Sequence, residues 1–386
     1  MWGADLRIRH DGGALWPHRS ASNAIFAFSS ESDPVTASTG GAPPLVVNAR
    51  FSRVRQTGVQ RVATELSQRL STERLLLSPA RLATGFGGYF WEQVLLPPQL
   101  DGRLLWSPCN VGPVTVRRQI VTIHDAAVID HPEWFSPAFV LACRSIWRRL
   151  VHTVRQIVTV SAFSRSRLAL AFDIPEHRIE VVPNGVSEAF RPRPEAEVAQ
   201  ALSELSLANA PYFATLSSLE PRKNLRLVLQ AWERARGRLP AGAKLLVIGA
   251  RGAQQVFAGD AGSPGLAEGV VELGYVPDAL LPPLLSGALG VLYPSFYEGF
   301  GLPLLEAMAC GAPVATTCNS SLPEVAGRAA IYVDAHDCED LARAMIQMAE
   351  SRSLREEMSE RSIERAAHFS WRKSAEQFDQ ILTRHI

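Results

Sequence analysis

The stretch Pro294-Ser295-Phe296-Tyr297-Glu298-Gly299-Phe300-Gly301-Leu302-Pro303-Leu304-Leu305-Glu306-Ala307-Met308 joins an apolar strand pattern, residues 289–293, to a helical one. Gly299 and Gly301 let the backbone approach a ligand closely, and Pro303 suits the first turn of a helix. The N–H groups of that first turn attract an anion. The stretch therefore predicts a phosphate-binding turn at the carboxyl end of a strand.

Two glutamates flank this turn. Glu298 lies in the loop, and Glu306 follows about two helical turns later. Their carboxylates can accept hydrogen bonds from the hydroxyls of a sugar and of a ribose on either side of a bound phosphate. The alternative is that Glu298 only complements the helix dipole and that Glu306 is a surface residue.

Short apolar runs that end in polar loops recur along the chain and alternate with helical patterns such as residues 59–70. The runs are residues 44–48, 119–123, 156–160, 179–182, 212–216, 244–249, 270–274, 289–293, 313–316 and 330–333. This order predicts an α/β protein with two doubly wound parallel sheets, that is, two Rossmann-like domains with ligands at the carboxyl ends of the strands.

The domain boundaries follow from composition. We expect residues 1–43 to be a poorly specified extension, residues 44–190 to form the first domain and residues 205–370 the second, with a Pro-, Arg- and Glu-rich linker between them. Ser370 suits the start of a last helix, residues 371–386. One face of that helix is apolar and must dock elsewhere in the protein: Trp371, Ala375, Phe378, Ile381 and Leu382.

The composition is that of a globular enzyme. The chain has 386 residues, 47% of them hydrophobic, and a mean hydropathy of +0.03. No secretory signal is recognisable in the first twenty residues, so we expect a cytoplasmic protein. The five cysteines are scattered without a C-x-x-C pair, which argues against a disulfide framework and a zinc site.

The net charge of +1 conceals an uneven distribution, because residues 1–195 contain 22 arginines and no lysine against 16 acidic residues. This excess is too weak to indicate nucleic acid, but it suits an anionic acceptor or peripheral contact with the cytoplasmic face of a membrane. Ordinary solvated arginines explain it equally well. The aromatic and basic stretch 143–156 either lies on a membrane interface or is a core helix with outward arginines, and the stripe Ile146, Leu150 and Val154 favours the core helix.

Three motifs are missing from the sequence. It has no G-x-G-x-x-G after the first strand of either half and no G-x-x-x-x-G-K-[ST], which argues against a dinucleotide oxidoreductase and a P-loop NTPase. It also has no Asp-x-Asp at a strand end to hold a metal-bound diphosphate. We therefore expect the protein itself to neutralise any bound phosphate.

The segment Leu219-Glu220-Pro221-Arg222-Lys223-Asn224 directly follows the first strand of the second half and would place two cations beside a diphosphate. Only three of the 39 basic residues are lysines, so composition alone does not explain Lys223 beside Arg222. A solvated turn is the alternative. Preorganised donors of this kind contribute about 3–4 kcal/mol each to transition-state stabilisation.

Together with Glu298 and Glu306, which match an E-x7-E signature, these residues resemble the retaining nucleotide-sugar glycosyltransferases of family 4, also called group 1. The strings Gly274-Tyr275-Val276-Pro277 and Ser320-Ser321-Leu322-Pro323-Glu324-Val325 extend the resemblance, which covers roughly residues 44–386 by order of elements. It implies the GT-B fold: two Rossmann-like domains facing across a cleft, with an acceptor-binding first domain, a donor-binding second domain and a C-terminal helix that crosses back to the first.

The resemblance also implies the roles of residues. Arg222 and Lys223 would neutralise the leaving diphosphate in place of a metal, Glu298 would hold the donor sugar and Glu306 the ribose. It implies no cofactor beyond a GDP- or UDP-linked sugar as co-substrate. The further donor-binding residues that it implies are Gly58, Ser218, Val276, Gly299, Phe300, Gly301 and Leu302.

The first half supplies His124 and Asp125, at the end of the apolar run 119–123. In similar enzymes the matching histidine lies at the anomeric centre and contributes a hydrogen bond or its backbone carbonyl, and Asp125 would orient it or contact the acceptor. A simple turn is the alternative for this pair.

Two loops of the first half are weaker candidates. Gly58 would place an N–H group near the diphosphate or only form a turn, and Arg61 faces either this site or solvent. Ser161 and Arg165 are placed near the site by the resemblance, although helix capping explains Ser161 equally well.

We expect a retaining, metal-independent glycosyltransferase that moves a hexose, first of all mannose from GDP-mannose, to a polysaccharide or lipid-linked oligosaccharide acceptor. The alternatives are another GT-B enzyme, such as a nucleotide-sugar epimerase or a phosphorylase, and a non-catalytic sugar-nucleotide-binding protein.

Overall fold

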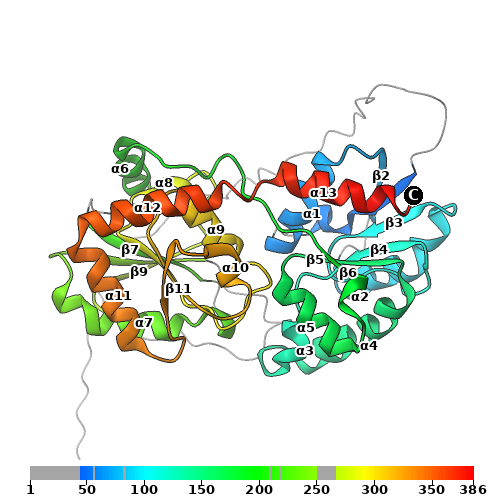
Figure 1. Ribbon diagram of the computed structural model, residues 1–386, viewed down its shortest axis with the longest axis horizontal. Helices are drawn as coiled ribbons and strands as arrows, with labels where there is room; N and C mark the ends of the chain where they lie inside the picture. The colour runs from blue at the N-terminus through cyan, green and yellow to red at the C-terminus, as the bar shows by residue number, and fades with distance from the viewer. Residues whose placement is uncertain (1–43, 55–56, 81–83, 208–209, 218–219, 250–266) are drawn as a thin grey trace, which may run out of the picture. The chain divides into compact units, whose positions relative to one another are not determined.

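The computed structural model describes residues 44–54, 57–80, 84–207, 210–217, 220–249 and 267–386 (Figure 1). They belong to one structural unit, within which all the contacts below are made. The predicted extension 1–43 and Ser218 lie outside the described residues.

The first sheet has six parallel strands in the order β2-β1-β3-β4-β5-β6. They are β1 (Leu45–Asn48), β2 (Arg74–Leu77), β3 (Leu104–Ser107), β4 (Gln119–Thr122), β5 (Gln156–Thr159) and β6 (Ile179–Val181). The strand order changes direction between β1 and β3, which is where doubly wound sheets bind ligands.

The second sheet also has six parallel strands, in the order β12-β11-β10-β7-β8-β9. They are β7 (Tyr212–Leu216), β8 (Lys244–Ile248), β9 (Val270–Gly274), β10 (Gly290–Tyr293), β11 (Val314–Thr317) and β12 (Ala330–Val333). Its order changes direction between β7 and β10, and these two strands carry the predicted Arg222-Lys223 and Glu298 loops at their carboxyl ends.

The helices alternate with these strands. They are α1 (Gly58–Arg69), α2 (Gly85–Phe90), α3 (Ala127–Asp130), α4 (Pro137–Thr153), α5 (Ala162–Phe172), α6 (Glu195–Glu204), α7 (Leu225–Ala235), α8 (Leu281–Ser286), α9 (Leu302–Ala309), α10 (Leu322–Ala326), α11 (Cys338–Glu350), α12 (Arg352–Ala366) and α13 (Trp371–Thr383). A π-helical turn, Trp91–Leu95, extends α2, and single 3-10 turns occupy Ala49–Arg53, Pro97–Gln99, Pro132–Trp134, Glu176–Arg178, Pro221–Lys223 and Arg236–Arg238.

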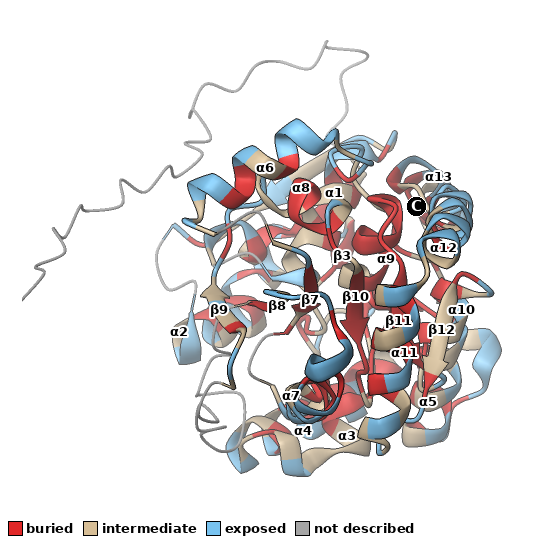
Figure 2. Ribbon diagram, turned by 90° about the vertical axis from the view of Figure 1, so that its left-hand side faces the viewer, coloured by how far each residue is buried: buried red, intermediate tan, exposed pale blue. Residues whose placement is uncertain are grey.

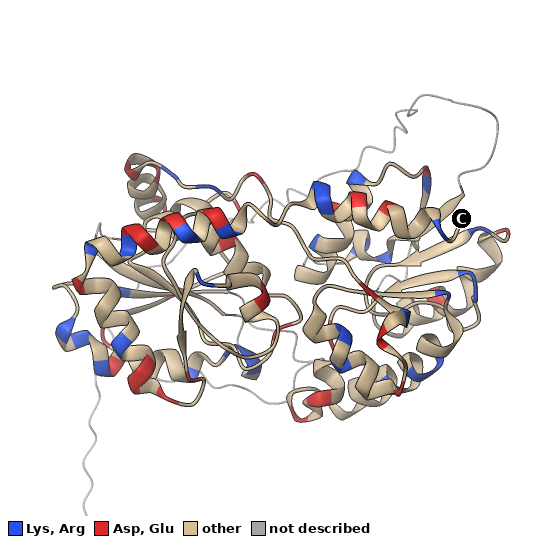
Figure 3. Cartoon of the chain, in the orientation of Figure 1, with Lys and Arg blue, Asp and Glu red and all other residues tan. Residues whose placement is uncertain are grey.

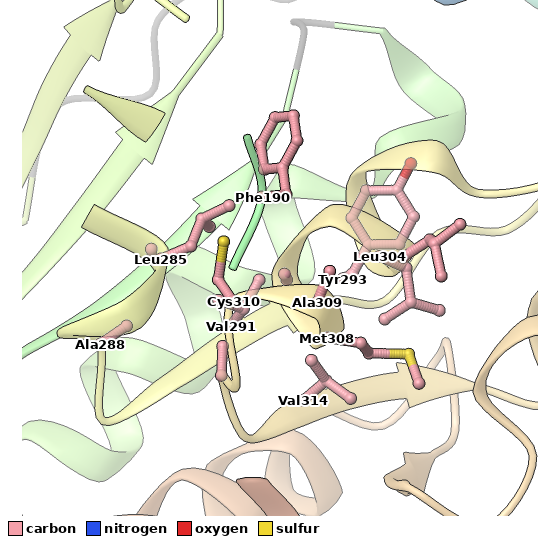
Figure 4. Close-up of a cluster of buried hydrophobic side chains, with 14 of the residues drawn as sticks. Phe190, Leu285, Ala288, Val291, Tyr293, Leu304, Met308, Ala309, Cys310 and Val314 are labelled. Atoms are coloured by element: carbon pink, nitrogen blue, oxygen red, sulfur yellow. The ribbon is translucent and has the colours of Figure 1, made fainter. Parts of the chain in front are cut away.

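Helices cover both faces of each sheet, which explains why the central strands are buried along their whole length and are rich in apolar residues. In the second sheet Val291 packs under α8, α9 and α10, whereas the adjacent Leu292 packs under α7 and α11. Figure 2 shows β7 and β10 buried at the centre, and Figure 4 shows the packing of β10 and β11 against α9. Charged side chains lie instead on helices such as α11, α12 and α13 (Figure 3).

The last helix, α13, packs on the first sheet, as the apolar stripe predicts. Phe378 is fully buried there, with its ring centroid 4.6 Å from that of Trp106. Ser370 caps the helix by accepting a hydrogen bond from the Lys373 N–H at 3.2 Å. The predicted fold class, two doubly wound sheets with a C-terminal helix returning to the first, is thus confirmed.

Some details of the prediction were wrong. Strands β2 and β3 were missing from it, and the predicted strands 289–293 and 313–316 are Gly290–Tyr293 and Val314–Thr317. Helix α6, which precedes residue 205, packs on the second sheet with α8. The favoured alternative for the stretch 143–156 is confirmed. Helix α4 covers it as far as Thr153, with Trp147 buried in the core while Arg148 and Arg149 are exposed.

Candidate functional site

Glu298 is the centre of a buried network at the carboxyl ends of β7 and β10. It is 4% exposed. Its Oε1 accepts hydrogen bonds from Lys223 Nζ at 2.7 Å and from the Tyr293 hydroxyl at 2.8 Å, and its Oε2 accepts one from Arg222 at 3.2 Å. The structure therefore brings together the two cations and the first glutamate of the signature.

The loops that carry this network fix its geometry. Arg222 and Lys223 lie in a 3-10 turn that ends at Asn224, whose φ of +57° is in the left-handed region. The Asn224 side chain donates to the carbonyls of Pro294 and Ala335, at 3.1 and 2.8 Å, and the Phe296 N–H donates to the Arg222 carbonyl at 2.8 Å. The Arg222-Lys223 turn and the loop that leads to Glu298 are thus tied together through the backbone.

Electrostatics keep the network charged. Burial on its own would raise the pKa of Glu298, but Lys223 and Arg222 outweigh burial and lower that pKa to about 2. Burial lowers the pKa of Lys223, although Glu298 acts in the opposite direction. The Arg222 side chain keeps 21% of its surface exposed, so its guanidinium can meet an anion from outside.

Tyr293, which the sequence analysis missed, completes the network. Its ring is buried in the apolar cluster beside Leu304, and its hydroxyl accepts a hydrogen bond from Lys223 Nζ at 2.6 Å (Figure 4). The only signal in the sequence is a hydroxyl-bearing residue at the end of the apolar run 289–293.

The first turn of α9 lies beside this network. The helix begins at Leu302 after Gly301, whose φ of +99° favours glycine, and no side chain of the described residues caps its first turn. The side chain of Phe300 is buried in the apolar core with that of Val276, so only the backbones of these two residues can contact a donor. This turn has the free N–H geometry of an anion site.

Glu306 lies on α9 and is 7% exposed. Arg61 of α1 pairs with Glu306 and with Asp278, the second at 3.0 Å. Burial raises the pKa of Glu306 to about 7 in spite of Arg61. Of the two alternatives for Arg61, the structure therefore has the side chain facing this site, and Glu306 is not a surface residue.

His124 and Asp125 follow β4. His124 is buried, and its Nε2 lies 2.9 Å from the Pro108 carbonyl, which can only accept a hydrogen bond. Burial lowers the pKa of His124, so the ring is neutral with its proton on Nε2, and Nδ1 is the acceptor. A Cβ atom at Gly299 would lie 2.9 Å from Asp125 Cβ, so Asp125 lies beside the loop that carries Glu298.

Gly299, in the loop between Glu298 and α9, contacts residues that belong to the first sheet. A Cβ atom at this position would lie 2.6 Å from the His124 carbonyl oxygen, so only glycine fits. The Gly299 carbonyl accepts hydrogen bonds from the hydroxyls of Ser161 at 2.6 Å and Ser164 at 3.2 Å. Ser161 also caps α5 by accepting from the Ser164 N–H, so both interpretations of Ser161 hold.

Not every predicted residue joins the site. Arg165 pairs with Glu176 at 3.0 Å, away from the Glu298 network. Gly58 is the first residue of α1, and a Cβ there would lie 3.8 Å from Leu302 Cδ1, so the first turns of α1 and α9 face each other.

In the described ranges, no group of three or more His, Cys, Asp or Glu side chains is arranged to hold a metal ion. No helix in the described part of the chain has the length and apolar character to span a bilayer.

Two family models match this chain. The one described as "Glycosyl transferases group 1" matches residues 203–365, and the one described as "Glycosyltransferase Family 4" matches residues 105–190. The second model thus covers His124, Asp125 and Ser161, and the first covers the E-x7-E signature.

Individual relatives agree with these matches. The O-antigen chain mannosyltransferase B of Escherichia coli is 36% identical over 264 residues, 67% of this chain and 68% of that protein. A GDP-mannose-dependent alpha-(1-6)-phosphatidylinositol monomannoside mannosyltransferase of Mycolicibacterium smegmatis is 31% identical over 212 residues, 52% of this chain and 55% of that protein.

Among solved structures, Anabaena HepE in complex with UDP and glucose superposes with a TM-score of 0.70 over 89% of this chain and 100% of that one, at 15% identity. At this identity the likeness concerns the fold, which is the two-sheet arrangement described above. The fold, the two model matches and the Escherichia coli relative lead to one conclusion: the chain belongs to the group 1, or family 4, glycosyltransferases with the GT-B fold.

Proposed function

We propose that the protein transfers mannose from GDP-mannose to a polysaccharide or lipid-linked oligosaccharide, with retention of configuration and without a metal ion. The observation that carries the proposal is the Arg222, Lys223 and Glu298 network beside the first turn of α9. The sugar and the nucleotide are suggested by the two relatives, which are named a mannosyltransferase and a GDP-mannose-dependent mannosyltransferase.

The leaving diphosphate is the charge that the site has to stabilise. Arg222 and Lys223 supply two positive charges, and the N–H groups at the start of α9 add a partial positive charge that also stabilises the diphosphate. Because Glu298 holds both cations in place before the donor arrives, little reorganisation is needed as charge develops. Donors of this kind contribute about 3–4 kcal/mol each.

Glu298 is ionised across the physiological range, because its pKa is lowered to about 2 by Lys223 and Arg222 acting against burial. It therefore serves as a hydrogen-bond acceptor for hydroxyls of the donor sugar and not as a proton donor. The neutral His124 offers Nδ1 as a second acceptor near the anomeric carbon. The acceptor hydroxyl attacks from the face that the diphosphate leaves, and a phosphate oxygen of the leaving group takes its proton.

We propose peripheral contact with an anionic membrane through α2 and its π-helical extension. Phe86, Phe90 and Val94 are 87%, 43% and 50% exposed at intervals of four residues, while the adjacent Trp91 is buried. An exposed apolar stripe in the arginine-rich half suits the interface of a bilayer that carries negative charge.

Calorimetric titration of GDP and of UDP in EDTA, with wild type and Arg222→Ala, tests the donor. We expect GDP to bind to the wild-type protein and UDP to bind at least tenfold more weakly. The Arg222→Ala variant should have a lower affinity for GDP. Preferred binding of UDP would overturn GDP-mannose, and binding only after addition of a divalent cation would overturn metal independence.

The reaction is tested by the product formed from GDP-mannose and a mannose-terminated oligosaccharide. Proton NMR of a new α-mannosidic bond supports retention, because the donor is α-linked, and a β-bond contradicts it. Epimerised nucleotide sugar without transfer would favour an epimerase, and a requirement for orthophosphate would favour a phosphorylase.

A further inference from the structure

Tyr297 directly precedes Glu298, but its side chain packs among helices of the other sheet. It is 4% exposed and belongs to the apolar cluster formed by α3, α4 and α5. Its ring contacts Phe163 and His131 edge-on, with centroids 5.1 and 5.5 Å away. The Tyr297 hydroxyl donates to Asp130 Oδ2 at 2.9 Å.

Asp130 is itself fixed. It ends α3, and Arg167 of α5 donates to its two carboxylate oxygens, from Nε at 2.9 Å and from the terminal nitrogen at 2.7 Å. Such a two-point contact restrains orientation as well as position. Burial, with Asp125 and Asp130 nearby, raises the pKa of Tyr297, so the hydroxyl keeps its proton and remains a donor.

Gly299, on the other side of Glu298, is held by the same half of the protein through Ser161 and Ser164. Residues 297 and 299 are therefore fixed by elements of the first sheet, while the carboxylate of residue 298 is fixed by Arg222, Lys223 and Tyr293 of the second. Glu298 is one peptide unit from each anchor, so a shift at either anchor moves its Cα.

We propose that the pair Tyr297 and Asp130 positions Glu298 for sugar transfer, so that docking of the first-sheet helices on the loop sets the geometry of the reacting site. The inference rests on the proposed function, in which Glu298 holds the donor sugar. The pair acts through Glu298 and is a positioning pair, because neither side chain touches the Arg222-Lys223 turn. Nucleotide binding uses groups of the second sheet and does not depend on the pair.

Tyr297→Phe is the test, since it removes one hydroxyl and keeps the ring. We expect kcat to fall at least tenfold, with the donor KM and the calorimetric GDP affinity within twofold of wild type. The double variant Tyr297→Phe/Asp130→Asn should be no slower than the slower single variant, because the two residues act as one unit. Unchanged kcat, a KM that rises with the loss of GDP affinity, or additive losses would each overturn the proposal.

Glu324→Gln is the matched control. Glu324 of α10 accepts from the N–H groups of Ala162 and Phe163, at 2.8 and 2.7 Å, and so joins the same two halves without touching the loop. We expect this variant to keep kcat within twofold of wild type. If its kcat fell as much as that of Tyr297→Phe, a general weakening of the contact between the two halves would explain both losses and the positioning role would be wrong.

The same measurements separate this inference from the proposed function. Failure of the wild-type protein to transfer mannose would count against the proposed function. If the wild type transfers mannose and Tyr297→Phe is equally active, only the positioning role is wrong.

Discussion

The guanidinium of Arg61 pairs with the carboxylate of Glu306, although the two residues are 245 positions apart and belong to helices of different sheets. The residue that the family resemblance assigns to the ribose is therefore paired with an arginine of the other sheet's helices. Arg61 also pairs with Asp278 at 3.0 Å, so one guanidinium joins two acidic side chains.

This pair predicts a pH dependence of stability. Burial raises the pKa of Glu306 to about 7 despite Arg61, above its ordinary value of 4.5. The folded protein therefore binds this proton more tightly than the unfolded chain, and the resulting stability is lost as the pH rises from 4.5 through 7. At about 1.4 kcal/mol per pKa unit, the loss amounts to roughly 3 kcal/mol. Thermal midpoints at pH 5 to 8 should fall more steeply for wild type than for Glu306→Gln; parallel curves would contradict the expectation.

Lys223→Met should destabilise the protein as well as inactivate it. The change leaves Glu298 buried with Arg222 and Tyr293 as its remaining partners, and breaking a buried pair costs about 3–5 kcal/mol. Adding Glu298→Gln removes the buried carboxylate charge that has lost Lys223, and should recover most of the unfolding free energy without recovering activity. Urea unfolding and mannose transfer should be measured on the wild type, on Lys223→Met and on the double variant. Recovery of both stability and activity in the double variant would contradict the prediction.

Arg222→Ala separates catalysis from folding more cleanly, because the side chain is partly exposed. We expect kcat/KM to fall by a factor of about 100 to 1,000, which corresponds to about 3–4 kcal/mol of transition-state stabilisation. Arg226→Ala, an exposed arginine on the next helix, is the control and should be unaffected. Activity of Arg222→Ala within twofold of wild type would remove the diphosphate role.

Vesicle binding tests the stripe on α2. The double variant Phe86→Ser/Phe90→Ser should bind vesicles with 30% phosphatidylglycerol at least fivefold more weakly than wild type in a sedimentation assay. Leu170→Ser, a comparably exposed apolar residue of α5 at 71%, is the control and should bind like wild type. Equal losses in both proteins would show that exposed apolar area in general, and not this stripe, drives the binding.

Phe378→Ala should lower the unfolding free energy by about 3–5 kcal/mol, because a fully buried aromatic side chain leaves a cavity against Trp106. Truncation of Ile363, which is 40% exposed on α12, should cost far less. Chemical unfolding followed by Trp fluorescence measures both changes, and similar losses would mean that α13 contributes little to the first sheet.

Local patterns in the sequence were sufficient for much of the fold. Buried strands such as Lys244–Ile248 are largely apolar runs, and the stretch 294–308 predicts a phosphate-binding turn flanked by Glu298 and Glu306. The strand Arg74–Leu77 was missed although Leu75, Leu76 and Leu77 form a short apolar run, because the run has only three residues and lies at a sheet edge where it is at most partly buried. The Tyr297–Asp130 and Arg61–Glu306 contacts join residues 167 and 245 positions apart, and no local periodicity records which helix faces meet.

The return of α13 to the first sheet makes the order of synthesis matter. When the ribosome has released residues 44–190, helix α1 can already pack on the face of the sheet that contains Trp106, but Phe378 and Leu382 of α13, which complete that cluster, are made only after the second sheet. The second sheet, whose strands and covering helices lie between Glu195 and Ala366, can complete its core earlier. We therefore expect the first sheet to complete its core after the second one, against the direction of translation, and to expose part of its apolar face to aggregation until α13 is made.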